Sequence, residues 1–296
     1  MPQSEPKICT AAVVVTFNRL ELLKQCVDAL RVQTIPCDIL IVDNASTDGT
    51  AEWAAAQMGI SYRNTGSNLG GAGGFNYGMR WAVDAGYDYV WVMDDDTMPK
   101  PDALEKLLEA DNILKGDYGW LSSVVLWTDG EICRMNLQRR TPYTDIHLTN
   151  DDCVPCAMAS FVSLFLKAET IKKYGLPIKD FFIWSDDWEY TRRISMNQLC
   201  YVASNSIVVH AMKSNKIVNI SDDSADRITR YKYFYRNDVY LYRREGFLGW
   251  LWLIAKNTKH SLQAVIKRRP ISTIGIIWKS FFDGIEFNPD VDTFNE

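Results

Sequence analysis

The sequence predicts an α/β fold with a mostly parallel sheet and a helical C-terminal extension. Up to about residue 115, short β-branched runs alternate with segments whose apolar residues recur at helical spacing. This alternation is typical of parallel sheets with crossover helices. From about residue 226 the pattern is helical and aromatic instead. We therefore expect a large domain over residues 1–225 and a helical extension over residues 226–296.

The first strand is predicted at residues 11–16, where AAVVVT is a continuous β-branched run typical of a strand buried on both faces. A helix is predicted over residues 20–30, because the apolar residues there repeat with helical period. The same two patterns predict the next elements: strands at 38–42, 60–63 and 89–93, helices at 50–58 and 102–114, and a glycine-rich loop over 64–78 that runs into a helix ending near residue 85.

The pattern changes beyond residue 115. Strands of mixed direction are expected, with a short helix between them and helical segments at the end of the chain. These elements are strands at 118–127, 156–166 and 206–209, a helix at 169–174, and helical segments at 227–244, 247–262 and 273–282.

The composition excludes several classes of protein. The chain has 296 residues, of which 47% are hydrophobic and 23% charged, an ordinary globular balance rather than that of a disordered chain. The formal net charge is −5, so no overall basic surface is present and no nucleic-acid partner is expected. Seven cysteines without a spacing framework favour a reducing compartment. The first ten residues lack the apolar segment of a signal peptide, and we expect a cytoplasmic protein.

Polar residues follow three of the predicted parallel strands: Thr16, Asp43 and the run Asp94-Asp95-Asp96. Ligands bind outside the carboxyl ends of such strands. Asp94 and Asp96 alternate and so face the same way, which makes them a candidate ligand pair for a hard divalent cation. The alternative is a solvated acidic turn that caps a helix beginning at Pro99.

Six of the 17 glycines lie between residues 66 and 78. Glycine permits a close approach of the backbone to a ligand, as well as positive φ. The segment matches neither the P-loop nor the GxGxxG pattern, and a flexible connector is the simpler alternative.

Clustered acids lie beside aromatic residues at Asp186, Asp187 and Glu189. This environment can tune a carboxylate for general-base work, whereas a helix N-terminus capped by Ser185 is an equally simple explanation. His210 ends a strand-like run; it is either structural or a third metal ligand beside two carboxylates. Cys153 and Cys156 form one CxxC, read either as two buried small side chains or as a redox pair.

Taken in order, these segments resemble the family 2 glycosyltransferases of the GT-A fold. The resemblance covers roughly residues 8–245 and rests on VVVTFNR at 13–19, IVDNASTDGT at 41–50, NLGGAGGF at 68–75, WVMDDD at 91–96 and FIWSDDWEY at 182–190 with Arg192. The glycine segment, the triple Asp and the aromatic acidic segment look most like the galactofuranosyltransferase and rhamnosyltransferase branch. The resemblance implies a Rossmann-like nucleotide-binding mixed sheet, and transfer of a sugar from a nucleoside diphosphate to an acceptor hydroxyl with inversion.

The resemblance also implies roles for individual residues. Asp187 matches the general base. The metal ligands would be Asp94, Asp96 and His210, holding Mn²⁺ or Mg²⁺. The donor-binding positions would be Thr16, Asn18, Arg19, Asp43, Asn68, Gly70, Gly71, Gly73, Gly74, Phe75 and Asp95, with Thr16 and Asp43 at the nucleoside. The acceptor-binding positions would be Trp184, Asp186, Trp188 and Glu189. Arg236-Asn237 matches an arginine–asparagine pair in the family's C-terminal helix.

UDP-galactofuranose is the first expectation for the donor, and dTDP-rhamnose or another UDP-hexose the second. The acceptor is expected to be a saccharide or a lipid-linked saccharide of a surface polysaccharide. Twelve basic residues lie between Arg227 and Lys279, including Lys267-Arg268-Arg269, against two acidic ones. This predicts peripheral contact with the inner face of an anionic membrane, the alternative being packing on the sheet or in a homo-oligomer. Outside this family, a nucleotidyltransferase and a non-catalytic saccharide-binding module remain as alternatives.

Overall fold

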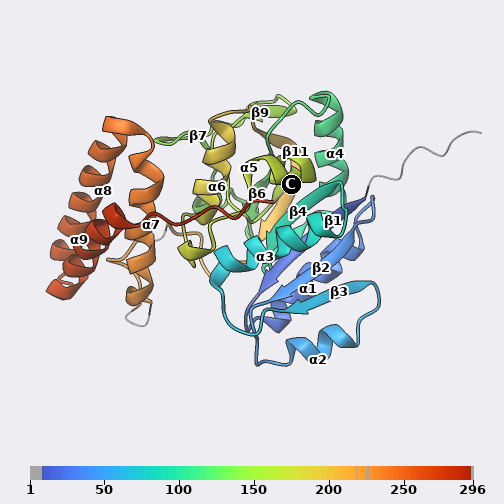
Figure 1. Ribbon diagram of the computed structural model, residues 1–296, viewed down its shortest axis with the longest axis horizontal. Coiled ribbons are helices and arrows are strands. Elements are labelled where there is room, and N and C mark those ends of the chain that lie inside the picture. Colours follow the sequence, from blue (N-terminus) through green and yellow to red (C-terminus); the bar gives the residue numbers. More distant parts are fainter. Residues whose placement is uncertain (1–8, 218, 225–226, 295–296) are drawn as a thin grey trace, which may run out of the picture.

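A mixed sheet runs through the centre of the molecule in the computed structural model, which describes residues 9–217, 219–224 and 227–294 (Figure 1). The strands of this sheet are β1 (Thr10–Thr16), β2 (Asp38–Asp43), β3 (Ile60–Asn64), β4 (Tyr89–Asp94), β5 (Thr97–Pro99), β6 (Leu121–Trp127), β9 (Cys153–Pro155), β10 (Leu164–Lys167) and β11 (Tyr201–His210). A separate hairpin consists of β7 (Arg139–Thr141) and β8 (Thr144–Asp145).

The helices lie on both faces of the sheet and at one end of the molecule. They are α1 (Leu20–Arg31), α2 (Thr50–Ala55), α3 (Gly70–Asp84), α4 (Ala103–Ile113), α5 (Ala168–Tyr174), α6 (Asp186–Ser195), α7 (Tyr231–Arg243), α8 (Gly246–Ile266) and α9 (Ile271–Glu286), with single 3₁₀ turns at Arg134–Asn136, Lys179–Phe181 and Ile228–Arg230.

The strand order is β3-β2-β1-β4-β10-β6-β11-β5, with β9 paired to β11. The first four strands are mutually parallel, while β10 runs antiparallel to both of its neighbours. The predicted fold class, a mostly parallel sheet flanked by helices with a helical C-terminal region, is therefore confirmed.

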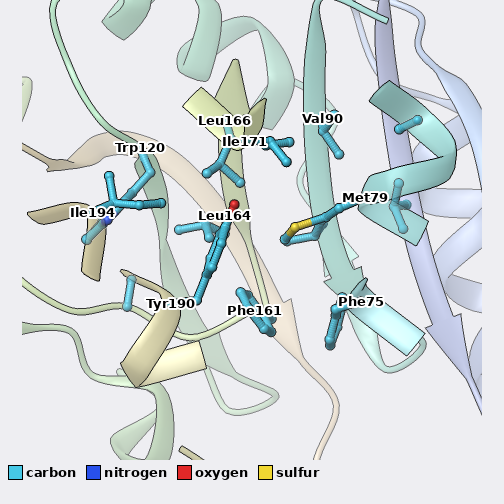
Figure 2. Close-up of a cluster of buried hydrophobic side chains, with 14 of the residues drawn as sticks. Phe75, Met79, Val90, Trp120, Phe161, Leu164, Leu166, Ile171, Tyr190 and Ile194 are labelled. Carbon is cyan, nitrogen blue, oxygen red and sulfur yellow. The ribbon is translucent and has the colours of Figure 1, made fainter. Parts of the chain in front are cut away.

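Both faces of β1 are buried, which explains its unbroken β-branched sequence. Ala12 and Val14 face the core that includes α1 and α4, whereas Ala11 and Val13 face the core that includes α3. Figure 2 shows this second core, where aromatic and aliphatic side chains from α3, β4, β10 and α6 meet. The strand ends are thus anchored by packing on both sides.

The glycine-rich segment was expected to be a loop, but from Gly70 onward it is helix α3. Its glycines let this helix pack closely on the sheet. A Cβ atom on Gly78 would lie 2.4 Å from Cγ1 of Val13, and one on Gly74 would lie 2.5 Å from Cγ1 of Val15. Neither the flexible connector nor the loop describes these residues, because tertiary packing outweighs the low helix propensity of glycine.

Two other elements differ from expectation. Helix α2 ends at Ala55, three residues before the predicted end at residue 58. Of the strand predicted at residues 156–166, only the end forms, because β9 stops at Pro155 and β10 begins at Leu164. The intervening residues include Met158, Phe161 and Val162, which are buried in the core. Their apolar character therefore reflects burial and not strand pairing.

The last three helices form a bundle at one end of the molecule, and the chain then crosses back (Figure 1). The carbonyl oxygen of Asp292 accepts a hydrogen bond from the backbone N–H of Leu176 (2.9 Å), and its carboxylate contacts Asn76 of α3 (3.1 Å). Arg80 of the same helix donates to the carbonyl of Thr293 (3.2 Å). The bundle is thereby tied to the sheet domain through the end of the chain.

Some expectations concern residues outside the described ranges. The expected domain boundary at residues 225–226 lies there, as do residues 1–8, on which the absence of a signal peptide was argued. Within the described ranges, no helix has the length and apolar character needed to cross a bilayer. Cys153 and Cys156 are both thiols, and the Cys156 thiol contacts the carbonyl oxygens of Arg139 (3.3 Å) and Met158 (3.2 Å).

Candidate active site

A cluster of two carboxylates and an imidazole lies at the carboxyl end of β4. This strand delivers Asp94, and the short strand β5 that follows pairs with β11 so that Thr97 lies opposite His210. As a result, ligand atoms of Asp94, Asp96 and His210 all lie within 4.8 Å of one another. The structure thus brings together the three residues predicted as metal ligands, although 114 positions separate Asp96 from His210.

The imidazole of His210 is oriented from both of its nitrogens. Its Nδ1 lies 2.7 Å from Oδ1 of Asn136, and its Nε2 lies 2.9 Å from Oδ1 of Asp96. When Nδ1 donates to Asn136, Nε2 faces the carboxylates, the arrangement that metal-ligating histidines adopt. Asn136 was not predicted from the sequence, because its 3₁₀ turn carries no recognisable motif.

The carboxylates of Asp94 and Asp96 at the end of β4 are largely buried and repel each other. Burial and the charge of Asp96 raise the pKa of Asp94 to about 7. Burial would also raise the pKa of Asp96, but His210 and Arg19 lower it. Burial alone would lower the pKa of His210, yet the hydrogen bond to Asp96 and the nearby negative charges raise it to about 10. Such a cluster favours a positively charged partner.

Arg19 and Thr16 contact the carboxylates of Asp95 and Asp96. The Arg19 guanidinium lies 2.5 Å from Oδ2 of Asp96 and 3.4 Å from Oδ1 of Asp95. The Thr16 hydroxyl donates to Oδ2 of Asp95 (2.7 Å). Asp95 and Asp96 are each only 4% exposed, and residues Thr97–Pro99 form a strand. The alternative of a solvated acidic turn capping a helix at Pro99 is therefore wrong.

The cluster fits a hard divalent cation. Carboxylate oxygens are the preferred ligands of Mg²⁺, and Mn²⁺ also accepts an imidazole beside them. The donor set of Asp94, Asp96 and His210 has this chemistry. The residues present are thus suited to Mn²⁺ or Mg²⁺, and the ligand roles themselves stay predictions.

Asp43 ends β2 on the same edge of the sheet and is fully buried. Its Oδ2 accepts a hydrogen bond from the Tyr62 hydroxyl (2.6 Å), and its Oδ1 accepts one from the backbone N–H of Ser46 (2.9 Å). Nearby, Oδ1 of Asn18 accepts from the backbone N–H of Thr47 (2.7 Å). Thr16 and Asp43, the two residues predicted at the nucleoside, are paired in register at the ends of β1 and β2. Tyr62 is a neighbour of Asp43 that sequence reasoning missed.

The residues predicted to line the donor diphosphate are in different environments. Asn68 is exposed and its Oδ1 accepts from the backbone N–H of Gly70 (2.8 Å), while a Cβ atom on Gly71 would have nothing within 4 Å. Gly73 packs on the Leu69 side chain, as Gly74 does on β1. Phe75 is 3% exposed and its ring centroid lies 4.6 Å from that of Phe161. Gly74 and Phe75 thus pack in the core, and their donor-binding roles stay predictions.

Asp187 lies in the first turn of α6, and its Oδ1 accepts from the backbone N–H of Trp188 (2.7 Å). Burial, the charge of Asp186 and the more distant charge of Asp94 raise its pKa well above the usual value. Burial also raises the pKa of Asp186 to about 6. Asp187 therefore has an environment suited to a proton acceptor, within reach of the charge of Asp94.

Ser185 stands at the N-cap position of α6, but its side chain does not cap the helix. Its φ is +62°, and its hydroxyl makes no capping hydrogen bond but donates to Oδ1 of Asp238 in α7 (2.7 Å). Asp186 and Asp187 do occupy the first turn of the helix, as both explanations required.

The other residues predicted to bind the acceptor contact protein groups. Glu189 is 2% exposed, and its carboxylate is bound by Arg193 (3.0 Å) and Arg244 (2.8 Å), which gives it a structural role between α6 and α7. The Trp184 ring packs on Tyr231, with ring centroids 5.0 Å apart. The Trp188 ring lies under the guanidinium of Arg139 at 4.6 Å. Both tryptophans are half-buried.

Comparisons with known proteins bear on the family and the fold of this chain. Residues 11–117 match the model of Glycosyl transferase family 2. The chain is 26% identical over 296 residues to galactofuranosyltransferase GlfT1 of Mycolicibacterium smegmatis, covering 87% of this chain and 94% of that protein. It is 36% identical over 104 residues to undecaprenyl-phosphate mannosyltransferase of Micrococcus luteus, covering 33% of this chain and 42% of that protein.

The fold is also similar to solved structures of GT-A type. The crystal structure of S. aureus TarS 1-349 superposes with a TM-score of 0.54 at 14% identity, covering 93% of this chain and 72% of that one. The family match over residues 11–117 includes Asp94 and Asp96. Residues 11–117 therefore form a glycosyl transferase family 2 domain within a GT-A fold, and the protein is a glycosyltransferase.

Proposed function

We propose that this enzyme is an inverting, divalent-metal-dependent glycosyltransferase that moves a sugar from a nucleoside diphosphate to an acceptor hydroxyl. One observation carries the proposal: ligand atoms of Asp94, Asp96 and His210 gather where they could hold a cation, and the charge of Asp94 helps to raise the pKa of Asp187. A leaving-group site beside a proton acceptor is what direct displacement at a sugar carbon requires.

In the proposed reaction, Asp187 takes the proton from the acceptor hydroxyl. The acceptor oxygen forms a bond to the anomeric carbon on the face opposite the leaving group. The bond between this carbon and the diphosphate oxygen breaks, and the diphosphate leaves with the electron pair. Asp94, Asp96 and His210 would hold Mn²⁺ or Mg²⁺, which when bound neutralises the diphosphate and acts as a Lewis acid. Asp43 accepts a hydrogen bond from the imide N–H of the base.

The donor that we propose first is UDP-galactofuranose, with dTDP-rhamnose or another UDP-hexose second. Support comes from the similarity over 94% of the length of a protein named galactofuranosyltransferase. The acceptor that we propose is a saccharide or lipid-linked saccharide.

We further propose that α8 contacts a membrane surface. Several large apolar side chains of α8 are exposed, and we call them the α8 face: Phe247, Leu248, Leu251, Trp252, Ile254, Leu262, Val265 and Ile266. Phe247 and Ile266 are 75% and 78% exposed. Lys259 and Arg268 are exposed basic residues on the same helix and just after it. An apolar helix face with adjacent basic groups suits an anionic lipid surface, and a lipid-linked acceptor would be found there.

Flotation with vesicles of neutral or anionic lipid tests the α8 face. Binding to anionic vesicles that is lost in Phe247→Ser/Ile266→Ser is the expected result. Dimerisation in solution without vesicle binding, measured by light scattering, would assign the face to a second copy of the chain and overturn the membrane proposal.

Calorimetry of UDP binding, in Mn²⁺ and then in excess EDTA, tests the enzymatic proposal. Binding that disappears with EDTA is expected, and a panel of UDP- and dTDP-sugars then identifies the donor by product formation. Saccharide binding that is indifferent to both nucleotide and metal would favour a binding module. Release of pyrophosphate from a nucleoside triphosphate would favour a nucleotidyltransferase.

A further inference from the structure

The loop before α6 has an unusual backbone. Phe182, Trp184 and Ser185 all have positive φ, near +64°, and they are three of the seven non-glycine residues with positive φ in the described part of the chain. Non-glycine residues are rarely found in this region, and they remain there only when the surroundings hold them. The loop ends directly at Asp186 and Asp187, so its conformation sets where α6 begins.

One side chain of α7 holds most of this loop. The carboxamide nitrogen of Asn237 donates to the carbonyl oxygens of Phe181 (3.0 Å), Ile183 (3.2 Å) and Trp184 (2.9 Å). The side chain is fully buried. Its three acceptors belong to consecutive parts of the loop, so a single group fixes the direction of several peptide planes.

The carboxamide is itself oriented by its neighbour. The guanidinium of Arg236 donates from two nitrogens to Oδ1 of Asn237 (3.0 and 2.8 Å), and it also donates to the carbonyl of Asp180 (2.6 Å). With its oxygen engaged by Arg236, the amide of Asn237 presents its nitrogen to the loop. The Arg-Asn pair therefore acts as one unit.

Asp238 extends the same contact. Its Oδ1 accepts from the Ser185 hydroxyl (2.7 Å), and its Oδ2 pairs with Lys256 of α8. On the opposite side, the carbonyl of Phe182 accepts from the backbone N–H of Ala72 in α3 (3.2 Å). Gly70 permits this approach, because a Cβ atom there would lie 2.0 Å from the Phe182 oxygen. The loop is thus held between α3 and the helical bundle.

We propose that Asn237 and Asp238 are positioning residues that hold the strained loop and so place the Asp187 carboxylate for proton transfer. This inference rests on the proposed function, in which Asp187 is the base. Neither residue contacts the acidic cluster, and their effect is transmitted through the backbone of residues 182–185. Catalysis is sensitive to small displacements of a reacting group, so loss of the Asn237 contacts lowers kcat while the donor site at the strand ends keeps its affinity.

The test compares Asn237→Leu with Asn257→Leu. Both asparagines are buried in the bundle, but Nδ2 of Asn257 has no hydrogen-bond partner and the residue lies on α8. We expect Asn237→Leu to lower kcat by about 10²-fold, with UDP affinity in Mn²⁺ unchanged by calorimetry, and Asn257→Leu to leave kcat within about twofold. Ser185→Ala removes one contact only and is expected to give a smaller loss of kcat if Asn237→Leu does not fold.

A double-mutant cycle with Asp187→Asn separates positioning from a general structural role. If Asn237 acts through Asp187, the loss caused by Asn237→Leu disappears in the Asp187→Asn background. Equal losses in both backgrounds would overturn the inference. Full turnover in Asp187→Asn alone would instead overturn the base role, so that failure of the proposed function is distinguished from failure of this inference.

Discussion

The two carboxylate sites on either side of the proposed reaction centre are held in place by different kinds of contact. Asp94 is the last residue of β4, and its position is set by the parallel pairing of β4 with β1, in which Asp94 lies opposite Val15. Asp187 follows a loop that would be strained in isolation, and side chains of α7 hold this loop. The sheet therefore fixes the position of Asp94, whereas the position of Asp187 depends on a contact with the C-terminal bundle.

This difference has a consequence for function. Changes at the sheet edge should affect binding of the metal and nucleotide, because we propose that both bind at the strand ends. Changes at α6 should affect proton transfer and leave nucleotide binding intact. If a change on one side impaired nucleotide binding and proton transfer equally, the two sites would not act separately as their contacts indicate.

Replacing Asp96 by Ala is expected to have the largest effect. It removes a proposed metal ligand and the partner of both His210 and Arg19. Loss of several kcal/mol of charge stabilisation corresponds to a fall of about 10⁴-fold in kcat/KM. Calorimetry should show that Mn²⁺ no longer strengthens UDP binding, whereas Asp102→Ala, at an exposed acid before α4, should behave as wild type. Retention of the Mn²⁺ effect in Asp96→Ala would remove Asp96 from the metal site.

Replacing Asp187 by Asn is expected to lower kcat by about 10³-fold, since general-base catalysis supplies factors of this order. UDP affinity in Mn²⁺ should not change, in contrast to Asp96→Ala. Transfer assays at saturating donor, together with UDP calorimetry, measure both quantities. A wild-type kcat in this variant would assign the proton acceptor to another group.

The same variant should be more stable than wild type at neutral pH. Burial raises the pKa of Asp187 in the folded state, so the folded protein binds the proton more tightly than the unfolded chain, and stability is lost as the pH rises through the folded pKa. Asparagine has no charge to bury, so the variant does not lose this stability as the pH rises. The difference in thermal midpoint between variant and wild type should therefore widen as pH increases from 4 to 7 (about 2–4 °C for each kcal/mol). A difference independent of pH would mean that Asp187 does not titrate in this way.

The sheet side of the site could be predicted from the sequence because it follows from local patterns. A continuous apolar run predicts β4, and the alternation of side chains at a strand end predicts that Asp94 and Asp96 share a direction. His210 was a weaker prediction from its residues alone, because the pairing of β5 with β11 is what brings it to Asp96. The family resemblance supplied that link.

The α6 side could not be predicted in the same detail. Nothing in the local sequence indicates positive φ at Phe182 or Trp184, since these residues disfavour it and a contact 53 to 56 positions away maintains it. Glu189 was expected to bind the acceptor, but Arg193 and Arg244 bind its carboxylate. The loop predicted for the glycine segment was wrong for a related reason. Packing on β1 decides its conformation, and this long-range contact cannot be read from the neighbouring sequence.

Replacing Gly78 by Ala tests how strongly the sheet side depends on the packing of α3. The new Cβ atom would lie 2.4 Å from Val13 Cγ1 and 3.0 Å from Val42 Cγ2. Overpacking of this kind lowers the free energy of unfolding by about 1–3 kcal/mol, despite the better helix propensity of alanine. Gly71→Ala is the matched control, because nothing lies within 4 Å of its Cβ position. Equal denaturant midpoints for the two variants would contradict this role for Gly78.

Replacing Tyr62 by Phe is expected to have the smallest effect and addresses the nucleoside corner. The Tyr62 hydroxyl donates to Oδ2 of Asp43 (2.6 Å), and burial together with this hydrogen bond raises the pKa of Tyr62 to about 12. Loss of one such hydrogen bond costs about 1 kcal/mol, so UDP should bind about fivefold more weakly if the bond orients Asp43 toward the base.

The strengthening of UDP binding by Mn²⁺ should survive in Tyr62→Phe, because the nucleoside corner and the acidic cluster end different strands. Calorimetry with UDP and with inorganic diphosphate distinguishes the two contributions: weaker binding of UDP alone locates the loss at the base. If UDP and inorganic diphosphate both bound more weakly to the same extent, Tyr62 would support the whole sheet edge and not the nucleoside corner alone.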